Sequence, residues 1–380
     1  MYEIDNYPQG HWQVGEERFI SKHQACLRAT ELNTDVKFVY FDHVWENFDR
    51  SLIGKYSLQE LYKIRAQQLR DSYDYLVLYF SGGADSWNVL RSFLDNGIHL
   101  DEVCVKWATD TINRGIYEPN TIDKTAFNYL SEWDYSIAPA LEWLKNNHPQ
   151  VKIEIVDWFK NREKALSEDV FTQVNHWHDI EIPSLAVWSP NEIALTDKGK
   201  RVGAIYGVDK PITINKNNKW YMYFRDGATC MGAPYKNNIF GVEFFYWSPK
   251  FPLLAFEGAN VAVKEFKTKL KNFAMREEQW MGWDHHDYLV QIQQETLRHV
   301  LYDNWTDNFQ ANKPVHLNRL DKHWWLRSHE LADYRKNYQG MMEDNLGQLS
   351  NSLLAYRNYG AGSRAVLYAS LETKHFFVTD

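Results

Sequence analysis

The chain has 380 residues, of which 44% are hydrophobic and 16% are aromatic, and this composition excludes a mainly disordered protein. The formal net charge of -8 provides no global positive field for nucleic acid, and a nucleic-acid partner would need a local basic patch. The length allows either one large domain with additions or two domains.

The three cysteines, Cys26, Cys104 and Cys230, lie far apart and form no CxxC motif. This spacing disfavours both a disulfide framework and a structural zinc site. The N-terminal residues contain no apolar secretory core, and no run of the sequence approaches the length of a membrane span. We therefore expect a cytoplasmic protein without a membrane partner.

Residues 1–70 are predicted to form an N-terminal extension that packs on the main sheet, with a short strand over residues 36–41. A helix is expected over residues 57–73, because Ser57 is a favourable N-cap and Glu60 stands at the capping-box position. This helix leads into the first strand of the main sheet.

The strand predicted over residues 75–80 runs into the turn SGGADS at residues 81–86, and a helix is expected to follow. The two adjacent glycines of the turn can adopt conformations closed to other residues, and they bring successive N–H groups close together. The start of the following helix adds unpaired N–H groups and a positive dipole end. This turn therefore favours an anion such as a phosphate, even without a dedicated lysine.

SGGADS after a hydrophobic strand resembles the SGGxDS signature of the PP-loop ATP pyrophosphatases, a superfamily that includes asparagine synthetase, GMP synthetase and PAPS reductase. In that family the loop grips the pyrophosphate of ATP, and most members cleave between the α and β phosphates. The resemblance implies Mg²⁺ and ATP as cofactors, with Asp85 as a metal ligand and catalytic residue. The implied pyrophosphate contacts are Ser81, Gly82, Gly83, Asp85 and Ser86. An ordinary glycine turn between a strand and a helix is the alternative.

Further parallel strands are predicted over residues 102–107, 151–156 and 203–208. A strand, helix, strand order implies a parallel pair with a right-handed crossover, and ligands of such open sheets collect beyond the carboxyl ends of the strands. The resemblance places the segment after the second strand near the adenosine. Trp107, Ala108 and Thr109 are therefore candidate adenine or ribose contacts, and a plain polar loop is the alternative.

The fourth of these strands ends in GVDKP, which contains Asp209 and Lys210. Lys210 at a strand's carboxyl end can reach the phosphates and neutralise charge as pyrophosphate leaves, while Asp209 can hold the metal or orient the lysine. Several PP-loop synthetases use a distal lysine in this way. A turn with a solvated charge pair is the alternative.

Two histidine clusters, His176 to Asp179 and Asp284 to Asp287, suggest metal binding, but neither offers a suitable ligand set. A loop that contacts substrate or a plain surface turn explains the first cluster better, and a helix N-cap with exposed histidines explains the second. The lysines of the helix expected over residues 254–273 are best read as solvated surface, although an acidic partner or RNA would also fit. The remaining C-terminal residues are rich in tryptophan and histidine. We expect them to be helical and to form the acceptor pocket over the carboxyl edge of the sheet.

Together these features predict an α/β protein with a HUP-like open parallel sheet and helices on both faces. The nucleotide-binding domain is expected over residues 71–250, between the extension at 1–70 and a helical region at 251–380. The loop and the YWSP segment also resemble PP-loop proteins of tailed bacteriophages, which would place the protein in the host cytoplasm.

The predicted function is an ATP-dependent ligase or transferase that adenylates an acceptor oxygen and releases pyrophosphate. Ammonia, an amine or sulfur would then displace AMP, and the acceptor would be a small metabolite, a nucleotide or a nucleic-acid base. A nucleotide-binding module without turnover is one alternative. A PAPS reductase-like protein is another, although the chain ends in KHFFVTD and lacks the Cys-Gly-Leu-His terminus of those enzymes.

Overall fold

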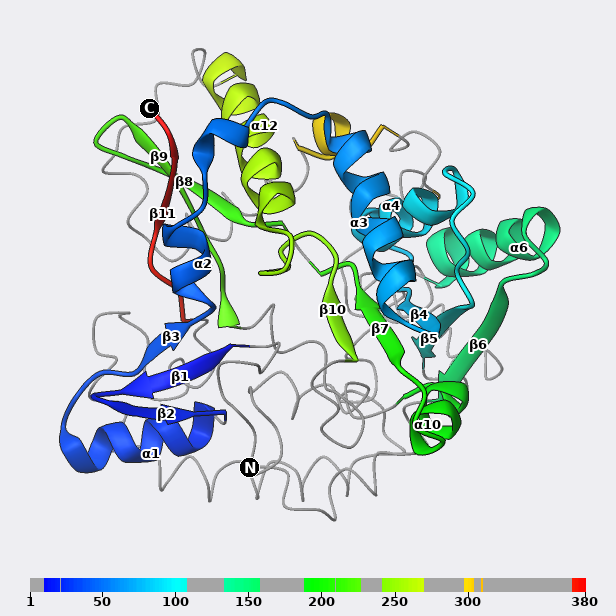
Figure 1. Ribbon diagram of the computed structural model, residues 1–380, viewed down its shortest axis with the longest axis horizontal. Coiled ribbons are helices and arrows are strands. Elements are labelled where there is room, and N and C mark those ends of the chain that lie inside the picture. Colours follow the sequence, from blue (N-terminus) through cyan, green and yellow to red (C-terminus); the bar gives the residue numbers. More distant parts are fainter. Residues whose placement is uncertain are drawn as a thin grey trace, which may run out of the picture.

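The computed structural model describes residues 10–20, 22–107, 133–157, 188–208, 210–226, 241–269, 297–303, 309 and 371–380. Within these ranges the chain forms an α/β fold around a five-stranded, all-parallel sheet (Figure 1). The strands in spatial order are β10 (Val242–Phe244), β7 (Val202–Tyr206), β4 (Tyr75–Tyr79), β5 (Glu102–Trp107) and β6 (Lys152–Asp157).

The four predicted parallel strands are confirmed, with ends that differ by at most two residues from those expected. The central strand, β4, pairs with β7 from Tyr75 opposite Val202 to Tyr79 opposite Tyr206. Strands that are buried on both faces read as continuous apolar runs, which explains why YLVLY could be recognised.

Helices flank this sheet on both faces. On one face, the buried carboxylate of Glu243 in β10 bonds to Arg65 of α3 (Leu58–Ser72). On the other face, the hydroxyl of Tyr79 in β4 bonds to Glu192 of α10 (Pro190–Asp197). Phe244 pairs with Tyr206, whose ring stacks on that of Tyr79, and these three side chains therefore share one face of the sheet. Because side chains alternate along a strand, Glu243, the residue before Phe244, points to the opposite face. The helices α4 (Ala84–Leu94) and α6 (Ala138–Asn147) link the strands β4, β5 and β6.

The predicted capping box at the start of α3 is present. The Ser57 hydroxyl accepts from the backbone N–H of Glu60 at 3.3 Å, and the Glu60 carboxylate accepts from the backbone N–H of Ser57 at 2.8 Å. These two bonds satisfy N–H groups that the helix itself leaves unpaired, and they fix the residue at which α3 begins.

Two smaller antiparallel sheets accompany the central one. The first has the order β2 (Glu17–Phe19), β1 (His11–Val14) and β3 (Lys37–Val39), and it contacts α1 (Lys22–Leu32). The second has the order β11 (Phe376–Thr379), β9 (Lys219–Tyr223) and β8 (Ile212–Lys216), and it contacts α12 (Pro252–Lys269). Shorter helices are α2 (Asp42–Glu46), a 3-10 turn (Arg50–Leu52) and a π-helical turn (Trp133–Ile137).

Residues Phe376–Thr379 form the strand β11, whereas a helix was expected up to residue 380. Phe376 and Val378 are buried while Phe377 and Thr379 are more exposed, and this alternation is the period of a strand. Pairing with β9 satisfies the backbone of this segment. Among the described helices, none has the length and apolar character needed to cross a membrane.

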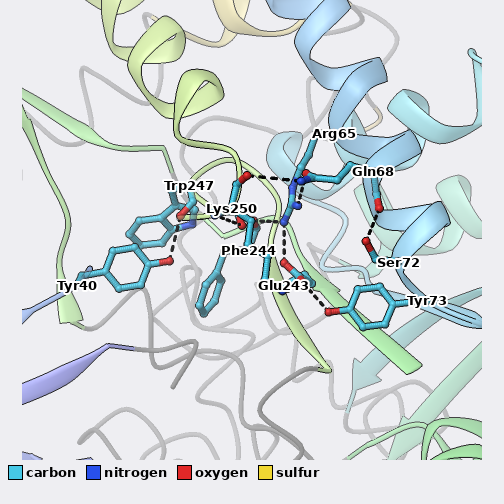
Figure 2. Close-up of polar contacts among 10 residues, drawn as sticks. Tyr40, Arg65, Gln68, Ser72, Tyr73, Glu243, Phe244, Trp247 and Lys250 are labelled. Atoms are coloured by element: carbon cyan, nitrogen blue, oxygen red, sulfur yellow. Dashed lines mark hydrogen bonds and ion pairs between the residues drawn. The ribbon is translucent and has the colours of Figure 1, made fainter. Parts of the chain in front are cut away.

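Aromatic side chains join the small sheets to the end of β10. Tyr40, which follows β3, is fully buried and donates a hydrogen bond to the carbonyl oxygen of Trp247 at 3.0 Å (Figure 2). Its ring also contacts the rings of Trp247 and Phe224, with centroids 5.6 and 5.2 Å away. Buried aromatics of this size dominate core packing, and they fix the extension against the parallel sheet.

A buried ion pair attaches α3 to the edge strand β10 (Figure 2). Arg65 Nη2 lies 2.8 Å from Glu243 Oε2, and the two side chains are only 1% and 4% exposed. Tyr73 and Lys250 donate to the other carboxylate oxygen, at 2.5 and 2.6 Å. Burial raises the pKa of Glu243, but the charges of Arg65 and Lys250 and the donated hydrogen bonds outweigh it and keep the pKa below its ordinary value.

Replacing Arg65 by alanine should therefore lower the free energy of unfolding by about 3 kcal/mol, because it removes the main partner of a buried carboxylate. Chemical denaturation of the variant would measure the loss. The control is Arg28→Ala, which breaks an exposed ion pair with Glu17 and should leave the denaturation midpoint nearly unchanged. Equal midpoints for the two variants would contradict the importance of the Arg65 to Glu243 pair.

Candidate functional site

The candidate site lies where the connections of the parallel sheet diverge. The chain leaves β4 through α4 toward β5 on one side, whereas β7 lies on the other side of β4. Open α/β sheets bind ligands beyond the carboxyl ends of their strands at such a switch point. The SGGADS turn follows β4, and the segment with Lys210 follows β7. Both predicted segments thus start from this one point of the sheet.

The conformation of the SGGADS turn requires a glycine at position 82. Gly82 has a φ of 75°, and a Cβ added there would lie 2.7 Å from Cγ1 of Ile137. Gly83 is the N-cap of α4 and has an extended conformation, with a φ of -76°. The positive end of the α4 dipole lies at this turn, and a helix N-terminus of this kind favours an anion.

The two serines of the turn bond mainly to the turn itself. The Ser86 hydroxyl donates to the carbonyl oxygen of Gly83 at 3.1 Å and accepts from the Ser81 N–H at 3.3 Å. Ser81 Oγ in turn accepts from the Gly83 N–H at 3.4 Å. Ser86 is buried while Ser81 is exposed. In this arrangement Ser86 shapes the turn, and Ser81 is the serine whose side chain meets solvent.

Asp85 and Lys210, which were predicted separately, form an ion pair. Lys210 Nζ lies 2.8 Å from Asp85 Oδ1, with the two side chains 13% and 28% exposed. The hydroxyl of Tyr302 donates to the same carboxylate oxygen, and Tyr246 donates to the Asp85 carbonyl at 2.7 Å. Burial raises the pKa of Asp85, but Lys210 and the Tyr302 hydrogen bond outweigh it, and the pKa falls below its ordinary value.

Gly207, the first residue of GVDKP, allows these segments to approach each other. A Cβ on Gly207 would lie 3.0 Å from Cα and 3.1 Å from the backbone nitrogen of Ser86. The end of β7 therefore packs directly on the first turn of α4. Its sequence signal was a glycine directly after a buried strand, and such a glycine indicates close approach of another backbone.

The other predicted site residues are placed less completely. Trp107 ends β5, is buried, and packs on the ring of Trp133 at a centroid distance of 5.6 Å. Its ring belongs to the core, which leaves little of it for a nucleotide. Ala108, Thr109 and Asp209 lie outside the described residues, as do Cys230 and both histidine clusters. Within the described ranges, no group of three or more histidine, cysteine or acidic side chains is arranged to hold a metal ion.

A second polar cluster lies at the same edge of the sheet, on the face that α10 covers. Lys106 Nζ lies 4.3 Å from the ring centroid of Tyr79, and the Tyr79 ring stacks on that of Tyr206 with centroids 4.8 Å apart. The Tyr79 hydroxyl donates to Glu192 and accepts from the Ser189 N–H. Burial raises the pKa of Glu192 to about 7. Only the lysine within the apolar strand VCVKW could have indicated this cluster from the sequence.

The fold and the geometry of this edge define an α/β protein whose parallel sheet is consistent with a Rossmann-like fold and carries a glycine turn at its switch point. We compared the chain with known protein families, with curated proteins and with solved structures, and none of the three comparisons found a match.

Replacing Gly207 by alanine should push the end of β7 away from α4 and separate Lys210 from Asp85. We expect a loss of about 1 to 3 kcal/mol in the free energy of unfolding, because the new methyl group meets backbone atoms. Gly258→Ala is the control, since a Cβ at this helical position meets nothing within 4 Å. That change should stabilise the protein by up to about 1 kcal/mol. Thermal unfolding of both variants would test the contact, and a neutral Gly207→Ala would contradict it.

The pH dependence of stability should report the buried carboxyl group of Glu192. Its pKa is raised from 4.5 to about 7 in the folded protein, which means that the folded state holds the proton more tightly than the unfolded chain. The resulting stabilisation is complete below pH 4.5 and is lost as the pH rises through about 7. Between these limits the wild type should lose on the order of 2 kcal/mol relative to Glu192→Gln. Parallel stability curves for the two proteins would contradict this shift.

Proposed function

We propose that the chain is a nucleotide-binding enzyme of the PP-loop type, with a HUP-like sheet, that binds ATP at the SGGADS turn. The observation that carries this proposal is the ion pair between Asp85 and Lys210. Two segments that are distant in the sequence, each singled out for phosphate chemistry, meet at the switch point of a parallel sheet. An incidental glycine turn would not require a lysine from the neighbouring strand.

Two features of this point favour a polyphosphate. The positive end of the α4 dipole lies at the SGGADS turn and attracts negative charge. Lys210 adds a full positive charge beside the first turn of α4. A lysine is a strong point charge for phosphate and can compensate the charge that develops on a leaving pyrophosphate.

The donor set fits a magnesium ion that arrives with the nucleotide. Mg²⁺ commonly binds through one or two protein carboxylates, substrate phosphates and water. Asp85 would be its protein ligand, and both bonds that the described residues make to its side chain fall on Oδ1. When bound, the ion would neutralise part of the phosphate charge. Dedicated coordination by several side chains is not required for this role.

The proposed reaction has two steps. An acceptor oxygen attacks the α-phosphorus of ATP, the bond to the oxygen bridging the α and β phosphates breaks, and pyrophosphate leaves with the bonding electrons. Ammonia, an amine or a thiol then attacks the activated acceptor, loses a proton, and displaces AMP. The chain contributes positioning through the turn and charge compensation through Lys210. The acceptor is a small metabolite, a nucleotide or a nucleic-acid base.

A nucleotide-binding module without turnover is the second candidate. The observation that favours it is the mutual pairing of the charged groups, because Asp85 already bonds to Lys210 and Tyr302. Such a site could hold a nucleotide as a structural or regulatory ligand. The two candidates differ in one measurable product, since only the enzyme converts ATP to AMP and pyrophosphate.

Incubation with Mg²⁺, ATP and pools of candidate acceptors should release AMP and pyrophosphate in equal amounts. Asp85→Ala should abolish this release, and Lys210→Ala should lower kcat by about a hundredfold while weakening ATP binding less. Lys264→Ala, at an exposed position of α12, is the matched control and should behave like the wild type. Full turnover in Asp85→Ala would refute the site. ATP binding without turnover under every condition would favour the regulatory module.

A further inference from the structure

A short segment from the C-terminal part of the chain lies against the candidate site. Residues 297–303 include a helical turn, and the side chains of Leu297, Leu301 and Tyr302 are buried (Figure 1, beside the upper end of α3). The Tyr62 hydroxyl of α3 donates to the carbonyl oxygen of Leu301 at 2.9 Å. These contacts hold the segment beside the first turn of α4, although its sequence contains no recognised phosphate motif.

Tyr302 connects this segment directly to the proposed catalytic carboxylate. Its hydroxyl donates to Asp85 Oδ1, the same oxygen that Lys210 contacts, and Lys210 Nζ lies 5.4 Å from the Tyr302 ring centroid. The ring also contacts that of Tyr246, whose hydroxyl bonds to the Asp85 backbone. Asp85 is therefore held through both its side chain and its main chain, which restricts the orientation of the carboxylate.

Arg298 brings a second positive charge from the same segment. The Arg298 side chain is half-buried, and its charge, like that of Lys210, lowers the pKa of Asp85. The backbone N–H of Tyr302 donates to the Arg298 carbonyl oxygen at 3.0 Å, which places the two residues one helical turn apart on the same face of the segment. Arg298 therefore lies on the face through which Tyr302 meets Asp85, beside the positive end of the α4 dipole.

We propose that residues 297–303 complete the phosphate site, with Arg298 binding the phosphate groups and Tyr302 acting as a positioning residue for Asp85. The proposal rests on the proposed function of the SGGADS turn and adds one wall to the same site. An arginine suits this task because its planar guanidinium can donate two parallel hydrogen bonds to one phosphate. A tyrosine suits the other, because its rigid ring holds the hydroxyl in one place.

Direct nucleotide binding tests the role of Arg298. In titrations of the full chain with ATP, Arg298→Gln should raise the Kd about tenfold, which is the loss expected for one charge-assisted contact to phosphate. The matched control is His299→Gln, at the exposed neighbouring position, and its Kd should stay within about twofold of the wild type. Arg298→Lys keeps the charge and should recover part of the lost affinity.

A split between binding and turnover tests the role of Tyr302. Tyr302→Phe keeps the ring and its packing but removes the hydroxyl that bonds to Asp85. The variant should lower kcat for pyrophosphate release about tenfold while the Kd for ATP changes less than about threefold. Tyr62→Phe removes the bond to Leu301 without touching Asp85, and its kcat should remain near that of the wild type.

The outcomes separate this inference from the proposed function. If Lys210→Ala and Asp85→Ala match the wild type in both ATP binding and turnover, the site itself is refuted and the inference falls with it. If those two variants lose affinity or turnover but Arg298→Gln behaves like His299→Gln, the inference is overturned while the proposed function stands. Equal kcat values for Tyr302→Phe and the wild type would likewise remove the positioning role.

Discussion

The parallel pairing of β4 with β7 is the constraint on which the candidate site depends. Since the two strands run in the same direction and are aligned from Tyr75 opposite Val202 onward, both leave the sheet at the same edge. The segments that follow the two strands therefore begin close to each other. The ion pair between Asp85 and Lys210 is the chemical consequence. A shift in the register of β7 would carry Lys210 away from the turn, because Lys210 lies only four residues beyond the end of this strand.

Buried charges secure elements that are distant in the sequence. Arg65 of α3 pairs with Glu243 of β10, and Lys22 of α1 pairs with Asp226, which follows β9, at 2.8 Å with both side chains buried. Desolvating a charge is costly unless it finds its partner, and each pair therefore accepts one arrangement of its elements. These pairs hold the extension, α3 and the second antiparallel sheet around the central strands.

The carboxyl edge of the sheet carries chemistry on both faces. On the side of α4 lie the glycine turn, Asp85 and Lys210, where an anion is favoured. On the side of α10, Lys106 lies over the rings of Tyr79 and Tyr206, and burial raises the pKa of Glu192 to about 7.

The sequence by itself determined the local features of this protein, because these depend on neighbouring residues. The strand before SGGADS, the need for glycine in the turn, the capping box of α3 and the lysine after β7 could all be read from short patterns. Only the tertiary structure decided which of these features meet. The contact of Gly207 with α4, the bonds from Tyr246 and Tyr302 to Asp85, and the strand at Phe376–Thr379 depend on partners far along the chain. Short-range patterns do not identify the partners in such contacts, since burial and long-range pairing are properties of the folded chain.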